Sequence, residues 1–348
     1  MTPRPAGVRW RVPLIKLRNA VAIALFAAAS PAAAQSVEEF YKGKTIQVQI
    51  GYGVGGTDDV WARVMSRYMP EFMPGSPSFV PSNVPGAGSL LLTNQLYNIA
   101  PKDGTVIGLF NRGVPFEPLL GGQSLRFEAA KFNFIGSPDR DTVVCVARSD
   151  APVRTLEDLK TKELIVGSTG SGADSQTYPE VTARLLGVKL KLVQGYPGSR
   201  DILLAIERKE VQGGCLSYDT IARDQNYRDK KLVIVFQAGL KSDERIPEIP
   251  LITDLARTNE ERQALALFFQ RSLVGRPFAA PPGVPPARVE ALRKAFAAAL
   301  NSPALKEEAK QVGLNIHYVS PDELQKIIAD AYAAPADVVA LTKKAFGR

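Results

Sequence analysis

Three short glycine-rich segments, each between a predicted strand and a predicted helix, are suited to binding an anion. They are residues 51–58 (GYGVGGTD), 167–174 (GSTGSGAD) and 195–199 (GYPGS), and residues 85–89 (PGAGS) form a weaker fourth example. Glycine allows the backbone to approach a bound molecule closely, and a helix N-terminus presents unpaired N–H groups and a partial positive charge. The pattern therefore indicates binding of an anion such as a carboxylate. For any one segment, the alternative is an ordinary turn in which Thr57 or Asp58 only caps the following helix.

Few side chains of the chain are suited to catalysis or to metal binding. The single histidine, His317, lies in residues 314–319, whose alternating pattern predicts a strand, so a structural histidine is the simpler interpretation. A zinc site needs three or four His, Cys or carboxylate ligands in close register, and the sequence holds no such cluster. The G-x-S-x-G motif and the complete phosphate-binding loop are also missing. We therefore predict a protein that is not an enzyme and holds no metal.

The first glycine-rich segment also satisfies the dinucleotide-binding pattern G-x-G-x-x-G, through Gly51, Gly53 and Gly56. That pattern requires an acidic residue at the end of the second strand, where it holds the ribose hydroxyls. The second predicted strand instead ends in residues 82–84 (SNV) and is interrupted by Pro81. This departure disfavours a dehydrogenase.

Strand and helix patterns alternate along the chain, which is typical of an α/β protein. The predicted strands cover residues 45–50, 78–84, 106–110, 143–147, 164–167, 190–193 and 232–236. We expect two α/β lobes, with the chain leaving the first near residue 137 and returning near residue 240. Lobe 1 then comprises residues 35–137 and 240–348, and lobe 2 comprises residues 138–239. The helical tail predicted after residue 286 is expected to pack on lobe 1.

The N-terminus has the features of a cleavable secretion signal. Residues 1–34 contain five basic and no acidic side chains, then an apolar stretch and a run of small residues. The apolar stretch is about half of the roughly 20 residues that a spanning helix requires. Five of the eight net positive charges belong to this leader, so the remainder carries only about +3. A mildly basic exported protein suits an anionic ligand and does not indicate a nucleic-acid partner.

Two cysteines, Cys145 and Cys215, are the whole complement of the chain. In an oxidising compartment an even, minimal count favours one disulfide, and neighbouring strands of one sheet would bring the two Cα atoms close enough. Two buried thiols are the alternative.

Four ordered motifs resemble the Bug family, the extracytoplasmic solute receptors of tripartite tricarboxylate transporters. They are residues 40–46 (FYKGKTI), 51–58 (GYGVGGTD), 83–89 (NVPGAGS) and 100–105 (APKDGT), and residues 280–285 (APPGVP) extend the likeness toward the tail. The resemblance implies a two-lobed, type II-like periplasmic binding protein whose lobes close on a small organic carboxylate, with no cofactor and no chemistry. It also implies the permease subunits of such a transporter as membrane partners, and we expect a monomer in the periplasm. A subunit that presents its ligand to a membrane signalling kinase remains the alternative.

The resemblance assigns ligand binding to the glycine-rich turns of both lobes. The residues so nominated are Tyr52, Gly53, Gly55, Gly56, Thr57, Asp58, Gly88, Ser89, Ser168, Thr169, Gly170, Ser171, Gly172, Ala173, Tyr196 and Gly198. Val54 and Thr57 depart from the commonest pattern of the family, which leaves the identity of the carboxylate open. Tyr52, Tyr196 and Tyr218 are expected to shape the distal part of the pocket or to pack the lobes.

Overall fold

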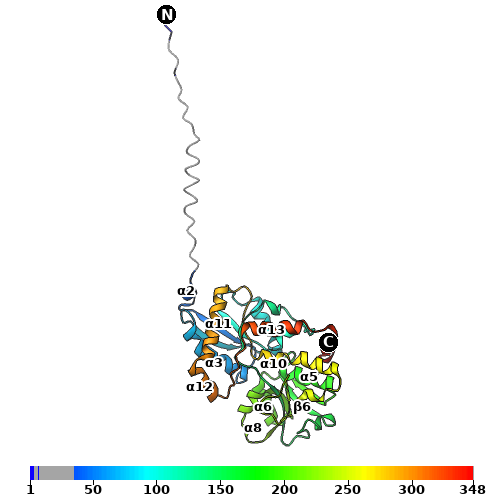
Figure 1. Cartoon of the computed structure of the whole chain (residues 1–348). Coiled ribbons are helices and arrows are strands. Elements are labelled where there is room, and N and C mark those ends of the chain that lie inside the picture. Colours follow the sequence, from blue (N-terminus) through cyan, green and yellow to red (C-terminus); the bar gives the residue numbers. More distant parts are fainter. Residues whose placement is uncertain (4–6, 8–34, 348) are drawn as a thin grey trace.

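The computed structural model describes residues 1–3, 7 and 35–347, so the predicted signal peptide falls almost wholly outside the described residues. The chain forms two α/β lobes, each built on one five-stranded sheet covered by helices (Figure 1). The prediction of a two-lobed α/β protein is therefore confirmed. Within the described residues, no helix is long and apolar enough to cross a membrane.

The first sheet has the strand order β2-β1-β3-β10-β4. Its strands are β1 (Thr45–Ile50), β2 (Ser78–Asn83), β3 (Val106–Leu109), β4 (Asn133–Gly136) and β10 (Phe278–Ala280). β1 pairs in parallel with β2 and β3, whereas β10 runs antiparallel to β3 and β4. The interrupting Pro81 lies in β2 at the edge of the sheet, where a missing N–H is tolerated. The carboxyl ends of β1 and β3 therefore lie at the same edge of this sheet.

The second sheet has the strand order β7-β6-β8-β5-β9. Its strands are β5 (Val143–Arg148), β6 (Leu164–Ser168), β7 (Leu190–Gln194), β8 (Gly213–Ser217) and β9 (Leu232–Ala238). Cys145 of β5 and Cys215 of β8 lie directly opposite each other, with 4.0 Å between their Cα atoms, and form a disulfide. The predicted disulfide is thus confirmed.

Helices cover both sheets and form the tail. Their bounds are α2 (Val37–Tyr41), α3 (Thr57–Phe72), α4 (Leu90–Asn98), α5 (Asp174–Leu186), α6 (Ser199–Glu207), α7 (Tyr218–Arg223), α8 (Gln225–Arg228), α9 (Asn259–Phe269), α10 (Arg271–Val274), α11 (Pro286–Asn301), α12 (Pro303–Gln311), α13 (Pro321–Tyr332) and α14 (Ala336–Ala345). In α3, Trp61, Val64, Met65 and Met69 recur at helical spacing and are buried, which fixes the face that packs in the core.

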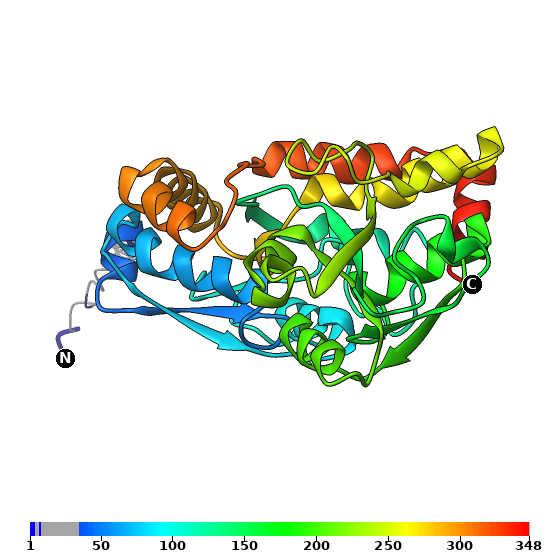
Figure 2. The ribbon, with the colours of Figure 1, turned by 90° about the horizontal axis from the view of Figure 1, so that it is seen from below.

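The helical tail packs on both lobes, which corrects the expectation that it covers lobe 1 alone. α11 and α12 contact α3, and α13 contacts β4 of the first sheet. α14 instead contacts α9 and α5, and α5 covers the second sheet (Figure 2). The strand predicted over residues 314–319 is wrong as well, because only Val319 makes a single bridge, to Ser137. The tail therefore ends against the second lobe.

The chain crosses between the lobes twice, after β4 and before β10, and the two crossings are tied together. The Arg276 backbone N–H donates to Ser137 Oγ at 2.7 Å, and Ser137 Oγ donates to the Asp139 carbonyl at 2.9 Å. Gly275 has a φ of +63°, and a Cβ built there would lie 1.7 Å from the Asp139 carbonyl oxygen. Only glycine fits this position. The crossings are therefore held in register where the lobes join.

Candidate ligand-binding cleft

The glycine-rich turns of the two lobes pack directly on one another. A Cβ built on Gly53 would lie 3.3 Å from the Pro197 carbonyl oxygen, and one built on Gly88 would lie 2.4 Å from the backbone nitrogen of Ala173. The Thr57 and Thr220 hydroxyls form a hydrogen bond of 2.6 Å between the lobes. The lobes are therefore closed, and the glycines are what permits this close approach.

A small polar cavity of about 40 Å³ remains between the closed lobes. It is lined by Tyr52, Asp58, Asn111, Arg112, Thr169, Asp174, Ser175, Ser199, Cys215, Leu216, Ser217 and Thr220. Ligand pockets usually measure about 300–1,000 Å³. An organic acid can therefore enter only when the lobes move apart.

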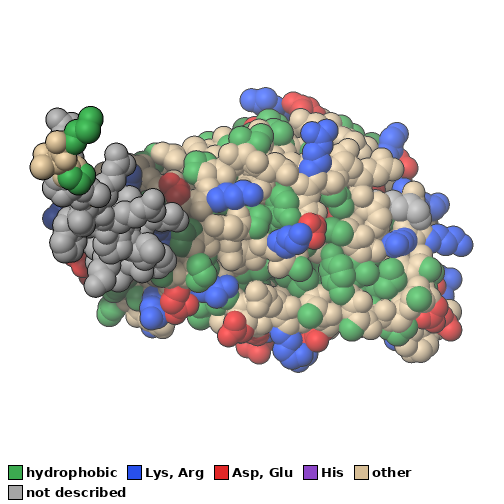
Figure 3. Space-filling view, turned by 90° about the horizontal axis from the view of Figure 1, so that it is seen from above, with side chains coloured by type: hydrophobic (Ala, Val, Ile, Leu, Met, Phe, Trp, Pro, Cys, Tyr) green, Lys and Arg blue, Asp and Glu red, His purple; other side chains and the backbone are tan. Residues whose placement is uncertain are grey.

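A larger cavity of about 570 Å³ lies elsewhere, beside α13, and has a mainly apolar wall that includes Phe127, Phe134 and Ile328. We place the candidate site at the smaller cavity, because the carboxyl ends of strands from both lobes meet there and polar groups converge on it. On the outer face seen in Figure 3, Lys, Arg, Asp and Glu side chains are scattered among one another.

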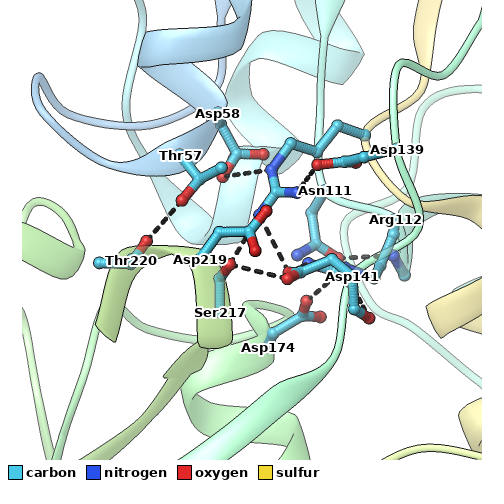
Figure 4. Close-up of polar contacts among 12 residues, drawn as sticks. Thr57, Asp58, Asn111, Arg112, Asp139, Asp141, Asp174, Ser217, Asp219 and Thr220 are labelled. Atoms are coloured by element: carbon cyan, nitrogen blue, oxygen red, sulfur yellow. Dashed lines mark hydrogen bonds and ion pairs between the residues drawn. The ribbon is translucent and has the colours of Figure 1, made fainter. Parts of the chain in front are cut away.

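Two buried arginines organise the charged side chains behind the cavity (Figure 4). Arg112 Nη2 lies 2.5 Å from Asp141 Oδ2, and Arg112 Nε lies 2.8 Å from Asp174 Oδ2, which belongs to the other lobe. Arg276 pairs with Asp139 and, at 2.9 Å, with Asp141. Buried charges are tolerated only when paired in this way. The network joins both lobes to both crossing segments.

The carboxyl groups of this network have different pKa values because their partners differ. Burial raises the pKa of Asp139 to about 7, although Arg276 opposes the rise. Burial acts in the same direction on Asp141, but Arg276 and Arg112 outweigh it and hold the pKa of Asp141 below its usual value. Burial also raises the pKa of Asp58. Asp141 is therefore the firmly ionised member of the set.

Two helices present their N-termini to the cavity from opposite lobes. α3 begins at Thr57 and α5 begins at Asp174, and neither helix has a side-chain cap on its first residues. The first N–H groups of a helix have no intrahelical acceptor, and they carry a partial positive charge. The two N-termini together can hold an anion between the lobes.

Asp58 faces the cavity, whereas its neighbour Asp59 makes polar contacts within the N-terminal segment of α3. Asp59 accepts a hydrogen bond from the Gly55 N–H at 3.0 Å and pairs with Arg63 at 2.9 Å. Asp58 makes no hydrogen bond to any described residue, and its side chain keeps 23% of its exposure. Of the two roles that the sequence left open for Asp58, the geometry favours the one in the cleft.

The nominated residues fall into three groups in the closed arrangement. Tyr52, Asp58 and Thr169 line the cavity, and Thr57 closes it through Thr220. A second group lies where the two lobes face each other, because a Cβ built on each of its glycines would lie within 4 Å of an atom of the other lobe: Gly53, Gly55, Gly56, Gly88, Gly172 and Gly198, with Ala173 opposite Gly88. Ser89, Ser168, Gly170, Ser171 and Tyr196 lie outside the cavity wall. Whether any of these residues contacts the ligand remains a prediction.

Ser89 and Ser168 have structural hydrogen bonds. Ser89 Oγ accepts from the Asn111 N–H at 2.7 Å, and Ser168 Oγ accepts from the Gly170 N–H at 3.2 Å. Tyr196 packs against the core of the second lobe, where a Cβ on Gly167 would lie 3.2 Å from its ring. These contacts shape the turns.

Several polar residues of the cleft were not nominated from the sequence. Asn111 and Arg112 follow β3, and Ser217 and Thr220 follow or overlap the end of β8. Asn111 Nδ2 donates to the Tyr52 hydroxyl at 2.7 Å. The sequence signal that could have found Asn111 and Arg112 is their position shortly after β3, at the same sheet edge as the first glycine-rich turn.

Comparison with known proteins gives a consistent assignment. A family model described as "Tripartite tricarboxylate transporter family receptor" matches residues 62–341. The chain is 26% identical over 328 residues to a UPF0065 protein of Bordetella pertussis, covering 91% of this chain and 94% of that protein. It is 24% identical over 318 residues to a UPF0065 protein of Cupriavidus necator, covering 89% and 90%.

Solved structures share the fold. The periplasmic binding protein BugD is 23% identical, with a TM-score of 0.71 over 88% of this chain and 99% of that chain. MatC from Rhodopseudomonas palustris, solved with bound malate, is 21% identical, with a TM-score of 0.69 over 85% and 99%. Since the matching model spans most of the chain, this protein belongs to the receptor family of tripartite tricarboxylate transporters, a family of periplasmic solute receptors.

Proposed function

We propose that this protein is an exported, monomeric receptor that captures a small organic carboxylate between its lobes. It delivers that ligand to the membrane permease subunits of a tripartite tricarboxylate transporter. It performs no chemistry on the ligand, and residues 1–34 are removed on export to the periplasm.

The observation that carries this proposal is the convergence of two helix N-termini on one polar cavity between the lobes. Asp58 at the start of α3 and Asp174 and Ser175 at the start of α5 all line that cavity. Unpaired backbone N–H groups from opposite lobes suit a carboxylate, whose oxygens accept hydrogen bonds on both sides. Opening and closing about the crossing segments would admit and enclose it.

Two structural neighbours support the ligand class. MatC was solved with bound malate, and a second protein of Rhodopseudomonas palustris, Rpa4515, was solved with adipate at a TM-score of 0.68. Both ligands are dicarboxylates. Because these neighbours are only 21% and 18% identical to this chain, the particular acid is a separate question.

A thermal-unfolding screen of the exported protein tests the proposal. A ligand present at 100 times its dissociation constant stabilises the closed form by about 2.7 kcal/mol, which raises the melting temperature of a protein of this size by about 5 °C. At least one mono-, di- or tricarboxylate should give that shift, whereas sugars and nucleotides should give none. A sugar that stabilises the protein while every carboxylate fails would refute the ligand class.

The delivery step needs its own test. Permease subunits in native membranes should be retained by the immobilised receptor more strongly with the ligand than without it. Retention of a membrane kinase in their place would assign the protein to signalling. Sequencing the N-terminus of the exported protein should find it near residue 35.

A further inference from the structure

Asp139 is a fully buried carboxyl group in the first crossing segment, and its two oxygens have unequal surroundings. Oδ2 accepts a hydrogen bond from Trp61 Nε1 at 2.7 Å and pairs with Arg276. Oδ1 is buried and has no hydrogen-bond partner among the residues that the structure describes. An ionised carboxyl group accepts hydrogen bonds on both oxygens, and a buried charged oxygen without a donor is unfavourable. A proton on Oδ1 removes that charge.

The charges around Asp139 do not balance in the closed arrangement. Arg276 pairs with both Asp139 and Asp141 (Figure 4). The same guanidinium group lies 3.8 Å from Asp58 Oδ2, so it faces three carboxyl groups. Asp141 has a second ion pair, with Arg112, whereas Asp139 has no second one within the described part of the chain. Protonation of Asp139 therefore relieves the excess of negative charge where it is least compensated.

Asp139 is attached to lobe 1, whereas part of the acidic cluster belongs to lobe 2. Trp61 lies in the core of lobe 1, and its hydrogen bond holds Asp139 there. Asp219, whose negative charge raises the pKa of Asp139, lies in α7, directly after β8 of the second sheet. Opening of the lobes moves Asp219 away from Asp139 and admits water to the cleft. Both changes favour the ionised carboxyl group, so the pKa of Asp139 is lower in the open form than in the closed form.

The other charged or titratable side chains near Asp139 come from several elements. They are Asp58 of α3, Arg112 after β3, Asp141 of the first crossing, Asp219 and Arg223 of α7, Arg276 of the second crossing, and His317 of the tail, whose backbone N–H donates to the Pro138 carbonyl at 2.9 Å. The arginines stay charged at any neutral pH. Asp58 keeps 23% of its side-chain exposure, and Asp219 has an ion pair of its own, with Arg245 at 2.6 Å. Asp139 has neither advantage.

We propose that Asp139 is a proton-binding site of the closed form. Closing of the lobes takes up one proton from the solvent on Asp139 Oδ1, and opening releases it. The buried cluster thereby loses one negative charge when the lobes enclose an anion. Because the closed form binds the proton more tightly, low pH favours closing, and this contribution is lost as the pH rises through about 7. The inference uses the closing that belongs to the proposed function, but it can be tested without a ligand.

Trp61 is a built-in reporter of this proton. It is the one tryptophan of the exported protein, because Trp10 belongs to the predicted leader, and its indole N–H donates to Asp139. Ionisation of the accepting carboxyl group changes the electrostatic environment of the indole. The fluorescence of Trp61, followed from pH 4.5 to 8.5, should therefore report the titration of Asp139.

A disulfide between the lobes can hold the closed form without a ligand. The Thr57 and Thr220 hydroxyl oxygens lie 2.6 Å apart, near the length of about 2.05 Å of a disulfide bond. The double variant Thr57→Cys and Thr220→Cys should therefore form a bridge under a mild oxidant, which intact-mass analysis verifies. Thr57→Cys alone is the matched control, because it cannot form the bridge and leaves the lobes able to open. The fluorescence midpoint should lie near pH 7 in the bridged protein and about one pH unit or more lower in the control.

Further substitutions in the bridged protein identify the titrating group. Asp139→Asn should abolish the transition. Asp219→Asn should lower its midpoint, because a like charge is removed, and it gives the answer if Asp139→Asn does not fold. His317→Gln is the control for a titrating histidine: His317 is exposed, its backbone contacts the same crossing segment, and its replacement should leave the midpoint unchanged.

Equal midpoints in the bridged protein and in Thr57→Cys, or no transition in the bridged protein, would refute the uptake of a proton on closing. A transition that survives Asp139→Asn, or that disappears with His317→Gln, would assign the proton to another group and overturn the proposal. If the bridge does not form, the closed arrangement on which the proposal depends is not reached, and the proposal fails as well. None of these results depends on whether a carboxylate binds, so the proposed function stands or falls separately by the thermal-unfolding screen.

Discussion

Replacing Gly88 by alanine should prevent full closure of the lobes while leaving each lobe folded. A Cβ at this position would lie 2.4 Å from the Ala173 nitrogen and 2.7 Å from the Ser171 carbonyl oxygen, and both atoms belong to the backbone of the other lobe. Carbon–heavy-atom contacts relax at about 3.5 Å or more, so the lobes must separate there by about 1 Å. The hydrogen bond of 2.6 Å between Thr57 and Thr220 and the short Arg112–Asp174 pair also cross between the lobes.

Losing two such contacts at about 1 kcal/mol each weakens the closed state by about 2 kcal/mol. Because the ligand binds the closed state, the apparent affinity should fall about 30-fold. The positive φ of +59° adds a cost of about 1–2 kcal/mol, but that cost is present in the open and closed states alike. It should therefore appear in unfolding and not in binding.

Gly187→Ala is the matched control for this argument. Gly187 has a φ of +70°, so alanine pays a similar torsional cost, but nothing would lie within 4 Å of its Cβ. We expect both variants to lose similar stability in urea unfolding and only Gly88→Ala to lose affinity in calorimetry. Equal affinities for the two variants would refute the claim that backbone contact at Gly88 limits closure.

Three further predictions follow from the cleft and the second sheet. Thr57→Val removes the hydrogen bonds to Thr220 and to Arg223 Nη2 (2.8 Å), so the affinity for the ligand should fall about fivefold or more in calorimetric titration. The free energy of unfolding of this variant should stay close to that of the wild type. Replacing both Cys145 and Cys215 by serine should cost about 4 kcal/mol, because the disulfide closes a loop of 70 residues; alkylation of the unreduced, denatured protein that labels two thiols would contradict the disulfide itself. The pKa of Asp139 is raised to about 7 in the folded protein, so the folded state keeps a proton that the unfolded state releases near pH 4. The contribution of Asp139 to stability therefore falls as the pH rises from 4 to 7. Asp139→Asn removes that contribution, so in urea unfolding from pH 4 to 8 the stability of the variant should improve relative to that of the wild type as the pH rises. A difference between their unfolding free energies that stays constant with pH would count against the raised pKa.

The two-lobed fold was predictable because most of its strands have strong local patterns. β1, for example, places Ile46, Val48 and Ile50 on one buried face. The strands that were missed lack such a signal. β10 has only three residues, and β8 begins with Gly213 and Gly214, which are poor strand formers. β8 needs this glycine at its first position, because a Cβ on Gly213 would lie 2.1 Å from the Val146 carbonyl oxygen of β5.

The turns of the cleft were predictable for the same reason, whereas its charged network was not. Glycine-rich turns are contiguous in the sequence, and their position after strands indicates which sheet edge they occupy. Arg112, Asp141 and Arg276 lie on three separate segments, and the hydrogen bond between Arg276 and Asp141 spans 135 residues. No spacing rule relates such residues, and only the pairing of β10 with β3 and β4 brings Arg276 beside the first lobe.

The crossing segments and the cleft share charged side chains, and this sharing constrains how the lobes can move. Asp141 pairs at once with Arg112 on the cavity wall and with Arg276 in the second crossing segment. Breaking a buried pair by removing one partner costs about 3–5 kcal/mol, so a motion that pulled Asp141 away from both arginines would be prohibitive. The Arg112–Asp174 pair is different, because Asp174 stands at the start of α5 and moves with the second lobe. We therefore expect opening to break the Arg112–Asp174 pair and to keep both pairs of Asp141, so that Arg112 and Asp174 become exposed together in the open cleft.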